Sequence, residues 1–414
     1  MSENSLSNRG SDEAGGRRKH VRLDSGTMKY LDAMLIKPLP DLEYKDQNDF
    51  GSTHIKAEPA CEAPRETIKR EDETECTKEN SESVLSGPIG IDIGTTHITV
   101  AQNNCKSIKT FRQLNAFFTL TSSKIVKKAL AKDGVSFFEK NKQLYICGSS
   151  AEEFATMHGA QIRKPIESGL LNPKEDDSIE VMKAIINSAI KKTRKDNTTI
   201  CFSVPGEPID KPVSTMFHES VIKMHLQSLG YTPVSVNAAL SVILSELADS
   251  NYTGIGISIG GGMCNVCFAY LSVPVITYSI QKGGDYIDAM VGNAVGEPVT
   301  KIKAAKENGF DLAAEPETKI ETGLHIFYDD LFATLTKSME QVFGASDKIP
   351  RLSNGIPIVL GGGSVSPKGC KERFEKALKG STFPFKISGV RIAENPLYAT
   401  ARGSLKMAIE EGST

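Results

Sequence analysis

The sequence predicts an α/β fold, and three observations support this prediction. Segments of strand and helix character alternate from Gly87 onward. Residues 88–100 and 254–280 share one layout, in which an apolar strand leads through a glycine turn into a returning strand. A third strand, at residues 357–363, also enters a glycine turn. The repeated layout indicates two similarly built domains.

The order of the other elements follows from hydrophobic periodicity and turn residues. After the first strand pair we expect a short strand at 143–147, an amphipathic helix at 178–192 and a buried strand at 198–204 that ends at Pro205. The pattern then predicts, in order, a helix at 213–229, a strand at 231–236, a helix closing at 242–247, the second strand pair, the third strand and a helix at 368–378.

The composition excludes several classes of protein. A chain of 414 residues has room for two or three domains of roughly 100–200 residues each. Its 49 basic and 51 acidic residues give a net charge of −2, which is too balanced for a dedicated nucleic-acid-binding protein. The eight cysteines lack the regular short spacing of a disulfide framework, so they are typical of reduced thiols in a cytosolic protein.

The longest uncharged stretch, residues 250–281, is long enough to span a bilayer as a helix. It contains three consecutive glycines, Asn265 and Pro274, and its apolar residues fall in short runs. This pattern favours buried strands joined by tight turns. Residues 1–10 are polar and show no secretory signal, so the expected location is the cytoplasm.

Residues 1–86 differ in composition from the remainder. They hold 13 basic and 18 acidic residues, a net charge of −5, and few large apolar side chains, which predicts a disordered tail. The one apolar island runs from Met28 to Lys37, with Met28, Leu31 and Leu35 at helical spacing. This island could form a short helix that binds a partner protein or a membrane surface, or it could stay unstructured.

The first glycine turn, residues 94–96, has the residue types that bind a phosphate. Gly94 can adopt positive φ, which lets consecutive N–H groups and the hydroxyls of Thr95 and Thr96 point at one anion. Asp92 would place a carboxylate beside that anion, where Mg²⁺ could bridge carboxylate and phosphate oxygens. The alternative is an ordinary glycine hairpin in which Asp92 bonds a turn N–H.

The second glycine turn, residues 260–263, repeats this layout, which strengthens the phosphate interpretation. The third, residues 361–364, precedes a predicted helix and could lie flat against a nucleoside. Neither is the G-x-G-x-x-G motif of dinucleotide-binding proteins, which needs its glycines between a strand and a helix, and no G-x-x-x-x-G-K-[ST] loop is present.

At these motifs the sequence resembles the actin-like ATPases, in particular the bacterial MreB branch and its magnetosome-filament relatives. Residues 90–100 (GIDIGTTHITV) resemble the family's first phosphate motif, residues 258–266 (SIGGGMCNV) its second, and residues 358–364 (IVLGGGS) its adenosine motif. Further matches follow in family-like order: SVPG at 203–206, KGGDYID at 282–288 and AENPLYATARGSL at 393–405.

The resemblance implies an actin-like (ribonuclease H-like) two-domain ATPase fold with Mg·ATP bound between the domains. Domain I would comprise residues 87–248 with a small subdomain inserted at 106–163. Domain II would comprise residues 249–414 with a smaller insert at 296–325. It also implies a cytoplasmic, cytoskeletal protein that assembles with itself into filaments.

The resemblance further implies a set of site residues. Asp92 would hold Mg²⁺ and act in catalysis, and the other motif residues would bind ATP or ADP. These are Gly94, Thr95 and Thr96 from the first turn, Gly260, Gly261, Gly262 and Met263 from the second, and Gly361, Gly362, Gly363 and Ser364 from the third. Lys303 matches the place where the family packs a helix against adenine, although a plain surface lysine is the alternative.

Three positions depart from the family's pattern. The family usually begins the second phosphate motif with Asp and follows its glycines with Thr, whereas this chain has Ser258 and Met263. Asn237 stands where the family has an acidic residue that polarises the attacking water. A carboxamide can position water but cannot accept its proton. We therefore expect Asp92, Asn237 and Ser258 to form a catalytic set that hydrolyses ATP slowly.

Other functions stay open at this point. A chaperone-type ATPase related to DnaK would need a peptide-binding domain, for which the expected domains leave no room. A small-molecule kinase would need a catalytic carboxylate, and Asp92 is the one candidate placed in a motif. A monomeric, nucleotide-sensing adaptor that recruits a partner is the third alternative. Asp285 and Asp288, in GGDYID, could approach a ribose but are expected to cap a helix.

Overall fold

The computed structural model describes residues 87–103, 107–193, 198–211, 213–350 and 355–413. The predicted disordered tail, and with it the apolar island from Met28 to Lys37, lies outside the described residues.

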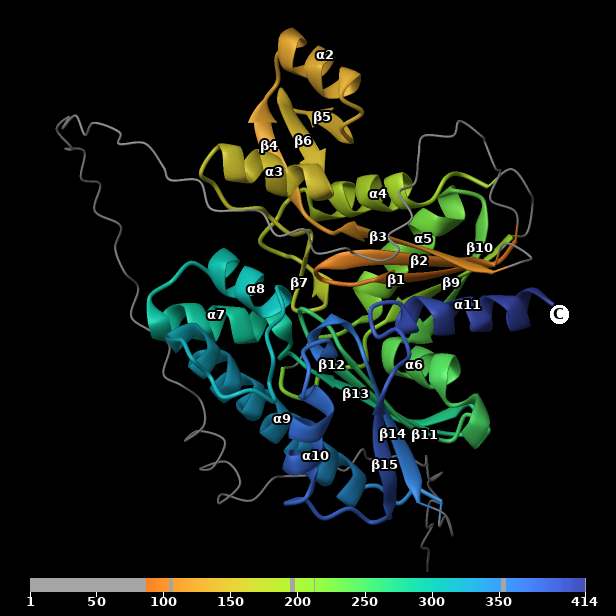
Figure 1. Ribbon diagram of the computed structural model, residues 1–414. Coiled ribbons are helices and arrows are strands. Elements are labelled where there is room, and N and C mark those ends of the chain that lie inside the picture. The colour runs from red at the N-terminus through yellow and green to blue at the C-terminus, as the bar shows by residue number, and fades with distance from the viewer. Residues whose placement is uncertain (1–86, 104–106, 194–197, 212, 351–354, 414) are drawn as a thin grey trace, which may run out of the picture. The chain divides into compact units, whose positions relative to one another are not determined.

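The described elements alternate along the chain in the way that the sequence predicts (Figure 1). The strands are β1 (Ile89–Ile93), β2 (His97–Asn103), β3 (Ile108–Leu114), β4 (Phe117–Thr121), β5 (Phe137–Lys140), β6 (Gln143–Cys147), β7 (Ile166–Glu167), β8 (Leu170–Leu171), β9 (Thr198–Val204), β10 (Tyr231–Asn237), β11 (Gly254–Ile259), β12 (Cys264–Tyr270), β13 (Val273–Ile280), β14 (Ile356–Gly361) and β15 (Ile387–Ile392). The helices are α2 (Lys124–Lys132), α3 (Ser149–Met157), α4 (Ser178–Ala189), α5 (Met216–Ser228), α6 (Ala238–Glu246), α7 (Gly284–Val295), α8 (Val299–Glu307), α9 (Lys319–Gly344), α10 (Cys370–Leu378) and α11 (Ala399–Gly412), with 3-10 turns η1 (Ala248–Ser250) and η2 (Gly363–Val365).

Two five-stranded mixed sheets form the centre of the fold. The first sheet has the order β10-β9-β1-β2-β3, and the second has the order β15-β14-β11-β12-β13. In each sheet the strand before the glycine turn is antiparallel to the returning strand and parallel to its other neighbour. The sheets therefore share one topology, and the predicted α/β fold with two similarly built halves is confirmed.

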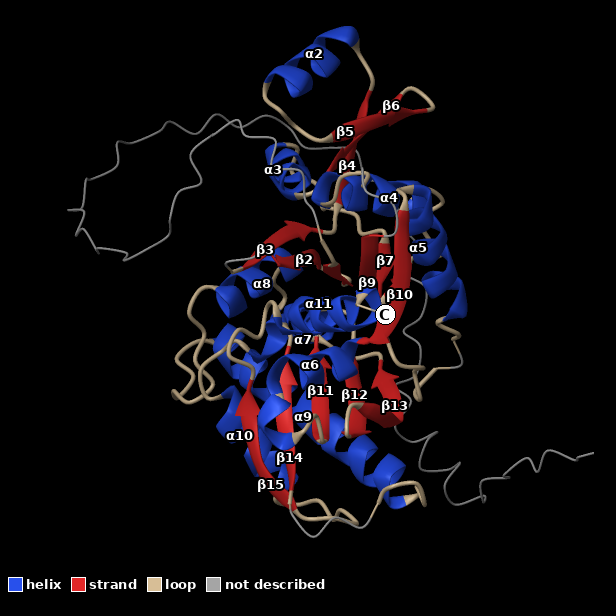
Figure 2. Cartoon of the chain, turned by 90° about the vertical axis from the view of Figure 1, so that its right-hand side faces the viewer, coloured by secondary structure: helices blue, strands red, loops and turns tan. Residues whose placement is uncertain are grey.

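In the central strand of each sheet, one glycine allows a helix to pack directly against the strand backbone. A Cβ on Gly90 in β1 would overlap the backbone of α11 at Ala401 and Leu405, and a Cβ on Gly256 in β11 would overlap the backbone of α6 at Ala239. Helices α6 and α11 also pack against each other, so the pair lies between the sheets (Figure 2). These close approaches explain why a glycine stands among the isoleucines of each strand, at Gly90 in β1 and at Gly256 in β11.

The opposite faces of the sheets carry the two main hydrophobic cores. The isoleucines of β1 pack with α4 and α5, including Val181, Ile185 and Ile222. The isoleucines of β11 pack with the 26-residue helix α9 and with α10. Helix α9 begins with a capping box in which Thr318 and Glu321 each accept a hydrogen bond from the other's backbone N–H. Alternation along each strand thus separates the core face from the face that holds α6 and α11.

Two observations refine the sequence-based expectations. Helix α4 ends at Ala189, earlier than predicted, because Ile190 has extended backbone angles. A separate three-stranded sheet, β4-β6-β5, packs with α2 and α3 in the segment between β3 and β7. None of the helices in the described ranges combines the length and apolar character that crossing a membrane requires.

Helix α5 carries a buried histidine, His218, and its burial predicts that the free energy of unfolding depends on pH. His218 is 2 % exposed, and neither of its ring nitrogens has a hydrogen-bond partner in the described part of the chain. Burial lowers the pKa of His218 to about 4. Because the unfolded chain then binds more protons than the folded chain, this residue's contribution is complete above pH ~6.5 and is lost as the pH falls toward 4.

The His218→Leu variant is expected to lose part of this acid sensitivity. Each pH unit across the interval is worth at most about 1.4 kcal/mol for one group. Urea unfolding at intervals between pH 4 and 7 measures the free energy of unfolding for both proteins. The expectation is wrong if the variant loses stability on acidification as steeply as the wild type does.

Candidate functional site

The first glycine turn joins β1 to β2 and is held in place by Asn115. The amide N–H of Gly94 donates to the carbonyl of His97 over 3.0 Å, which closes the turn. The Asn115 side chain donates to the Gly94 carbonyl, and its backbone N–H donates to the Thr96 carbonyl, both over 2.8 Å. Asn115 is fully buried. The turn is therefore rigidly fixed by a residue that the motif does not include.

The second glycine turn joins β11 to β12 and is fixed by α7 and the third turn. Its carbonyls at Gly260 and Gly261 accept hydrogen bonds from the first two amides of α7, at Gly284 and Asp285, over 2.9 and 2.8 Å. The Ser364 hydroxyl also donates to the Gly260 carbonyl over 3.0 Å. Contacts with α7 and with the third turn therefore hold the second turn in place.

The first and second turns meet directly. A Cβ on Gly261 would overlap the Thr96 hydroxyl, and a Cβ on Gly262 would overlap the Thr95 hydroxyl. The Thr95 hydroxyl accepts a hydrogen bond from the Gly169 amide over 2.9 Å, whereas the buried Thr96 hydroxyl has no partner among the described residues. Glycine is required at both positions of the second turn because the opposite turn occupies the space of a side chain.

Unused hydrogen-bond donors gather at this meeting point. Among the described residues, no acceptor lies within hydrogen-bonding distance of the amides of Thr95, Thr96, Gly261 and Gly262. Together with the Thr96 hydroxyl, these amides make a set of donors of the kind that binds an oxyanion such as phosphate.

Asp92 is the penultimate residue of β1 and lies two residues before Gly94, where the first turn begins. The Ser203 hydroxyl donates to one of its carboxylate oxygens over 2.5 Å. Burial raises the pKa of Asp92, and the hydrogen bond from Ser203 and the charge of Arg112 oppose that rise. In the described ranges no group of three or more His, Cys, Asp or Glu side chains could hold a metal ion. Asp92 offers a single carboxylate, so a Mg²⁺ held there would need phosphate oxygens and water to complete its coordination.

The third glycine turn uses two of its glycines for packing. A Cβ on Gly361 would lie 2.9 Å from the Val242 side chain, and Gly362 has a φ of +93° where a Cβ would overlap the Ile259 carbonyl. Gly363 is different, because its Cβ position is 3.4 Å from Leu397 and 4.0 Å from the Arg112 guanidinium. Of the three glycines, Gly363 is the one at which a Cβ would meet only ordinary van der Waals contacts.

On α8 it is Lys306, three residues after Lys303, that contacts α7. The Lys306 ammonium contacts Asp288 over 2.7 Å and the Gly284 carbonyl over 3.0 Å, and both charged side chains are less than a tenth exposed. Lys303, one helical turn earlier on α8, lies 3.9 Å from Glu152 on α3. Asp288 is thus a buried ion-pair partner and not a helix cap, because the N-cap of α7 is Gly283 and no side chain caps the helix.

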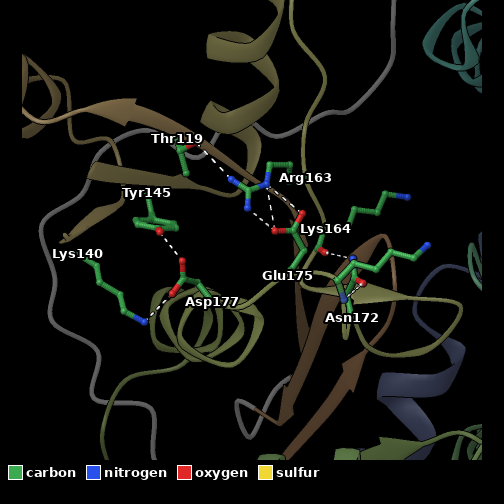
Figure 3. Close-up of polar contacts among 9 residues, drawn as sticks. Thr119, Lys140, Tyr145, Arg163, Lys164, Asn172, Glu175 and Asp177 are labelled. Carbon is green, nitrogen blue, oxygen red and sulfur yellow. Dashed lines mark hydrogen bonds and ion pairs between the residues drawn. The ribbon is translucent and has the colours of Figure 1, made fainter. Parts of the chain in front are cut away.

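A polar network around α4 positions a further lysine toward α7. Arg163 pairs with Glu175, while Tyr145 and Lys140 both donate to Asp177 (Figure 3). The Lys164 backbone carbonyl in the same network accepts from Asn172 over 3.3 Å. The Lys164 ammonium then pairs with Asp285 over 2.8 Å, which joins the segment before β7 to the start of α7.

Burial and, to a smaller extent, nearby positive charges lower the pKa of His97, which directly follows the first turn. Burial together with Arg112, Lys303 and Lys164 lowers the pKa of His97 to about 3, so its imidazole is neutral at physiological pH. Cations from β3, α8 and the segment before β7 therefore act on one place. That place adjoins the unused donors of the two turns and favours an anionic ligand.

Comparisons with known proteins identify the family of this chain. The model of the Volactin family matches residues 88–408. The chain belongs to the Volactin family. Its relatives include the actin-like protein MamK of Paramagnetospirillum magneticum, which is 22% identical over 346 residues that cover 78% of this chain and 92% of MamK.

Solved structures place this Volactin-family chain in the actin-like fold. The MamK double helical filament matches with a TM-score of 0.60 and 20% identity, over 78% of this chain and 98% of MamK. MreB5 of Spiroplasma citri bound to AMPPNP matches with a TM-score of 0.57 and 14% identity, over 78% and 98%. MreB5 of the same organism bound to ADP has a TM-score of 0.56 and 14% identity, over 79% and 97%.

Within this Volactin-family chain, the three atypical residues are engaged in local contacts. The Asn237 carbonyl oxygen caps α6, accepting from the amides of Ala239 and Leu240 over 3.0 and 3.2 Å. The Ser258 hydroxyl is buried and lies 3.5 Å from the Thr400 hydroxyl in the first turn of α11. Met263 is 4% exposed, and its thioether fills the space beside Gly169.

Sequence reasoning missed Asn115, Lys306 and Arg112. Lys306 had a usable signal, because it stands three residues after Lys303 and therefore on a neighbouring part of the same helix face. Asn115 and Arg112 lie on or next to β3, outside every motif, and only the pairing of β3 with β2 brings them to the first turn.

Proposed function

We propose that this chain binds ATP between its first and second glycine turns and polymerises in a nucleotide-dependent way. The observation that carries the proposal is the contact between the two turns, in which four amides and the Thr96 hydroxyl have no hydrogen-bond partner among the described residues. Since the turns touch in this structure, phosphates that enter between them would separate the first sheet from the second. Nucleotide binding would in this way change the geometry of the whole chain.

Each group of residues has a defined role in this proposal. The first and second turns bind the phosphates through their amides, and the third turn accepts the nucleoside at Gly363. The Lys306–Asp288 pair orients α7 and α8 beside it. Asp92, oriented by Ser203, would hold Mg²⁺, which supplies charge neutralisation to the phosphates when bound.

Slow hydrolysis follows from the residues at the atypical positions. With its carbonyl oxygen committed to the α6 cap, Asn237 has only its NH₂ group to offer a water molecule, and an NH₂ group cannot accept a proton. Ser258 adds no carboxylate near Asp92. Phosphoryl transfer depends on positioning and charge stabilisation, so these absences reduce turnover while the turns still bind phosphate.

Polymerisation rests on the relatives rather than on a contact in this chain. Of the three solved structures compared with this chain, the MamK double helical filament has the highest TM-score. A shared fold alone does not fix function. For this reason the assembly of this chain needs its own experiment, described at the end of the Discussion.

Calorimetric titration with ATP, ADP and GTP in the presence of Mg²⁺ tests the binding part of the proposal. We expect one nucleotide site per chain and a melting temperature that rises with ATP concentration, since a ligand that binds only the folded state stabilises it by about 2.7 kcal/mol at one hundred times its Kd. Failure to detect binding of any nucleotide at millimolar concentration would contradict the proposal.

A further inference from the structure

Arg112 occupies one end of a polar row across the first sheet. Residues directly opposite on neighbouring strands share a face, and the register pairs Asp92 with Thr99 and Thr99 with Arg112. On the other side of β1, Ile91 pairs with Phe202, so Ser203 follows beside Asp92. The row thus runs from Ser203 through Asp92 and Thr99 to Arg112, on the face that α11 covers only in part.

The Arg112 guanidinium lies between the first and third glycine turns. One of its terminal nitrogens donates to Nδ1 of His97 over 2.8 Å, directly after the first turn. The same nitrogen is 4.0 Å from the position that a Cβ on Gly363 would occupy. One half-buried cation from the first sheet therefore reaches toward the third turn, which belongs to the second sheet.

Arg112 differs from the other arginines of the described ranges in its partners. Arg163, Arg373, Arg391 and Arg402 each form an ion pair with a carboxylate. Within the described residues, Arg112 has no carboxylate within 4.0 Å, and its one hydrogen bond goes to the neutral imidazole of His97. A partly buried charge is normally paired, because its desolvation is otherwise uncompensated.

The surroundings identify the missing partner as an anion. Tyr398, Glu307 and Asp92 act on Arg112 only through longer-range electrostatics, while burial lowers its pKa. The unused amides of the first turn and the Thr96 hydroxyl lie on the adjoining residues. A guanidinium has five N–H donors in a planar fork that suits phosphate oxygens, and here most of them are unengaged.

We propose that Arg112 binds the phosphate chain of the nucleotide and supplies from β3 a positive charge that none of the glycine motifs contains. This inference rests on the proposed nucleotide binding and adds to it the residue that neutralises the phosphates from the protein side. The Arg112–His97 hydrogen bond holds the guanidinium beside the first turn before nucleotide enters, so little side-chain freedom is lost on binding.

Titrations of ATP and adenosine with purified variants test this role. For Arg112→Leu we expect the Kd of ATP to rise roughly 10- to 100-fold, the usual effect of a hydrogen-bonded charge pair, and the Kd of adenosine to stay within about twofold. Arg112→Lys should recover part of the ATP affinity, since it restores the charge without the fork.

Arg373→Leu is the matched control. Arg373 donates to Nδ1 of His325 over 2.9 Å, as Arg112 does to His97, but it also pairs with Asp329 and lies on α10. We expect this control to leave both Kd values unchanged. Thermal melting without nucleotide verifies that each variant folds.

The outcomes separate this inference from the proposed function. Wild-type protein that binds neither ATP nor ADP would overturn the proposed function itself. If the wild type binds ATP and Arg112→Leu binds it equally well, only the role of Arg112 is wrong. An equal loss for adenosine and ATP would also overturn that role, because it would show stacking on adenine or a structural effect.

Discussion

Gly403→Ala is expected to destabilise the protein by about 3 kcal/mol or more, or to prevent folding. A Cβ on Gly403 would overlap the backbone carbonyl of Ser241, where α11 crosses α6. Neither helix can move aside locally, because α11 packs directly on Gly90 of β1 and α6 packs directly on Gly256 of β11. The methyl group would have to push the two sheets apart, and overpacking of this kind is among the strongly destabilising changes.

Gly344→Ala is the matched control for Gly403→Ala. Gly344 is also helical, at the last position of α9, and no atom lies within 4 Å of the place where its Cβ would be. Alanine favours a helix over glycine by about 1 kcal/mol, so this variant should be neutral or more stable. Denaturant unfolding measures both; Gly403→Ala at wild-type stability would mean that the α6–α11 crossing is not as close as described.

Restoring two carboxylates is expected to raise ATP hydrolysis by about 10²-fold or more. The variant combines Asn237→Glu, which supplies a group able to take a proton from water, with Ser258→Asp. An aspartate at 258 would face Thr400 in the first turn of α11, and a helix N-terminus favours negative charge. The cost is the α6 cap, about 1 kcal/mol, which a melting curve will reveal.

The control variant has side chains of the same size as the carboxylate variant at both positions but adds no negative charge. Asn237→Gln combined with Ser258→Asn alters the same two side chains without adding a carboxylate, so its phosphate release should stay at the wild-type level. Slow wild-type hydrolysis would need another cause if the carboxylate variant binds ATP yet releases phosphate no faster than this control.

The fold was predictable because its signals are local and repeated. Alternation of isoleucine with glycine in β1 and β11 marks both strands, and the turns that follow them mark the hairpins. The same glycines also seat α11 and α6, a long-range contact that no local pattern reveals. Periodicity thus predicts the elements, while the spacing between layers depends on contacts between residues far apart in the chain.

The candidate site was predictable by position but not by side-chain direction. Motif matching singles out Asn237, Ser258 and Met263, and only the structure shows that their side chains cap α6, face Thr400 and fill the space beside Gly169. A motif gives a residue's place along the backbone, whereas its partners depend on neighbouring elements.

Lys303 and Lys306 illustrate the same limit on one helix. Both lie on α8, three residues apart, but α7 offers a buried carboxylate, Asp288, only to Lys306. Arg112 is harder still, because β3 has no motif and its register with β2 decides what the guanidinium meets. Charged residues on a strand next to a motif therefore need the strand pairing before they can be interpreted.

The most direct test of the account is sedimentation of the full chain with ATP, with ADP and without nucleotide, with phosphate release measured in the same tubes. We predict that the amount of pelleted protein depends on the nucleotide and that polymer forms well before a matching amount of phosphate appears. Equal pellets in all three tubes would contradict nucleotide-dependent assembly, and protein that binds ATP but stays in every supernatant would indicate a monomeric adaptor instead.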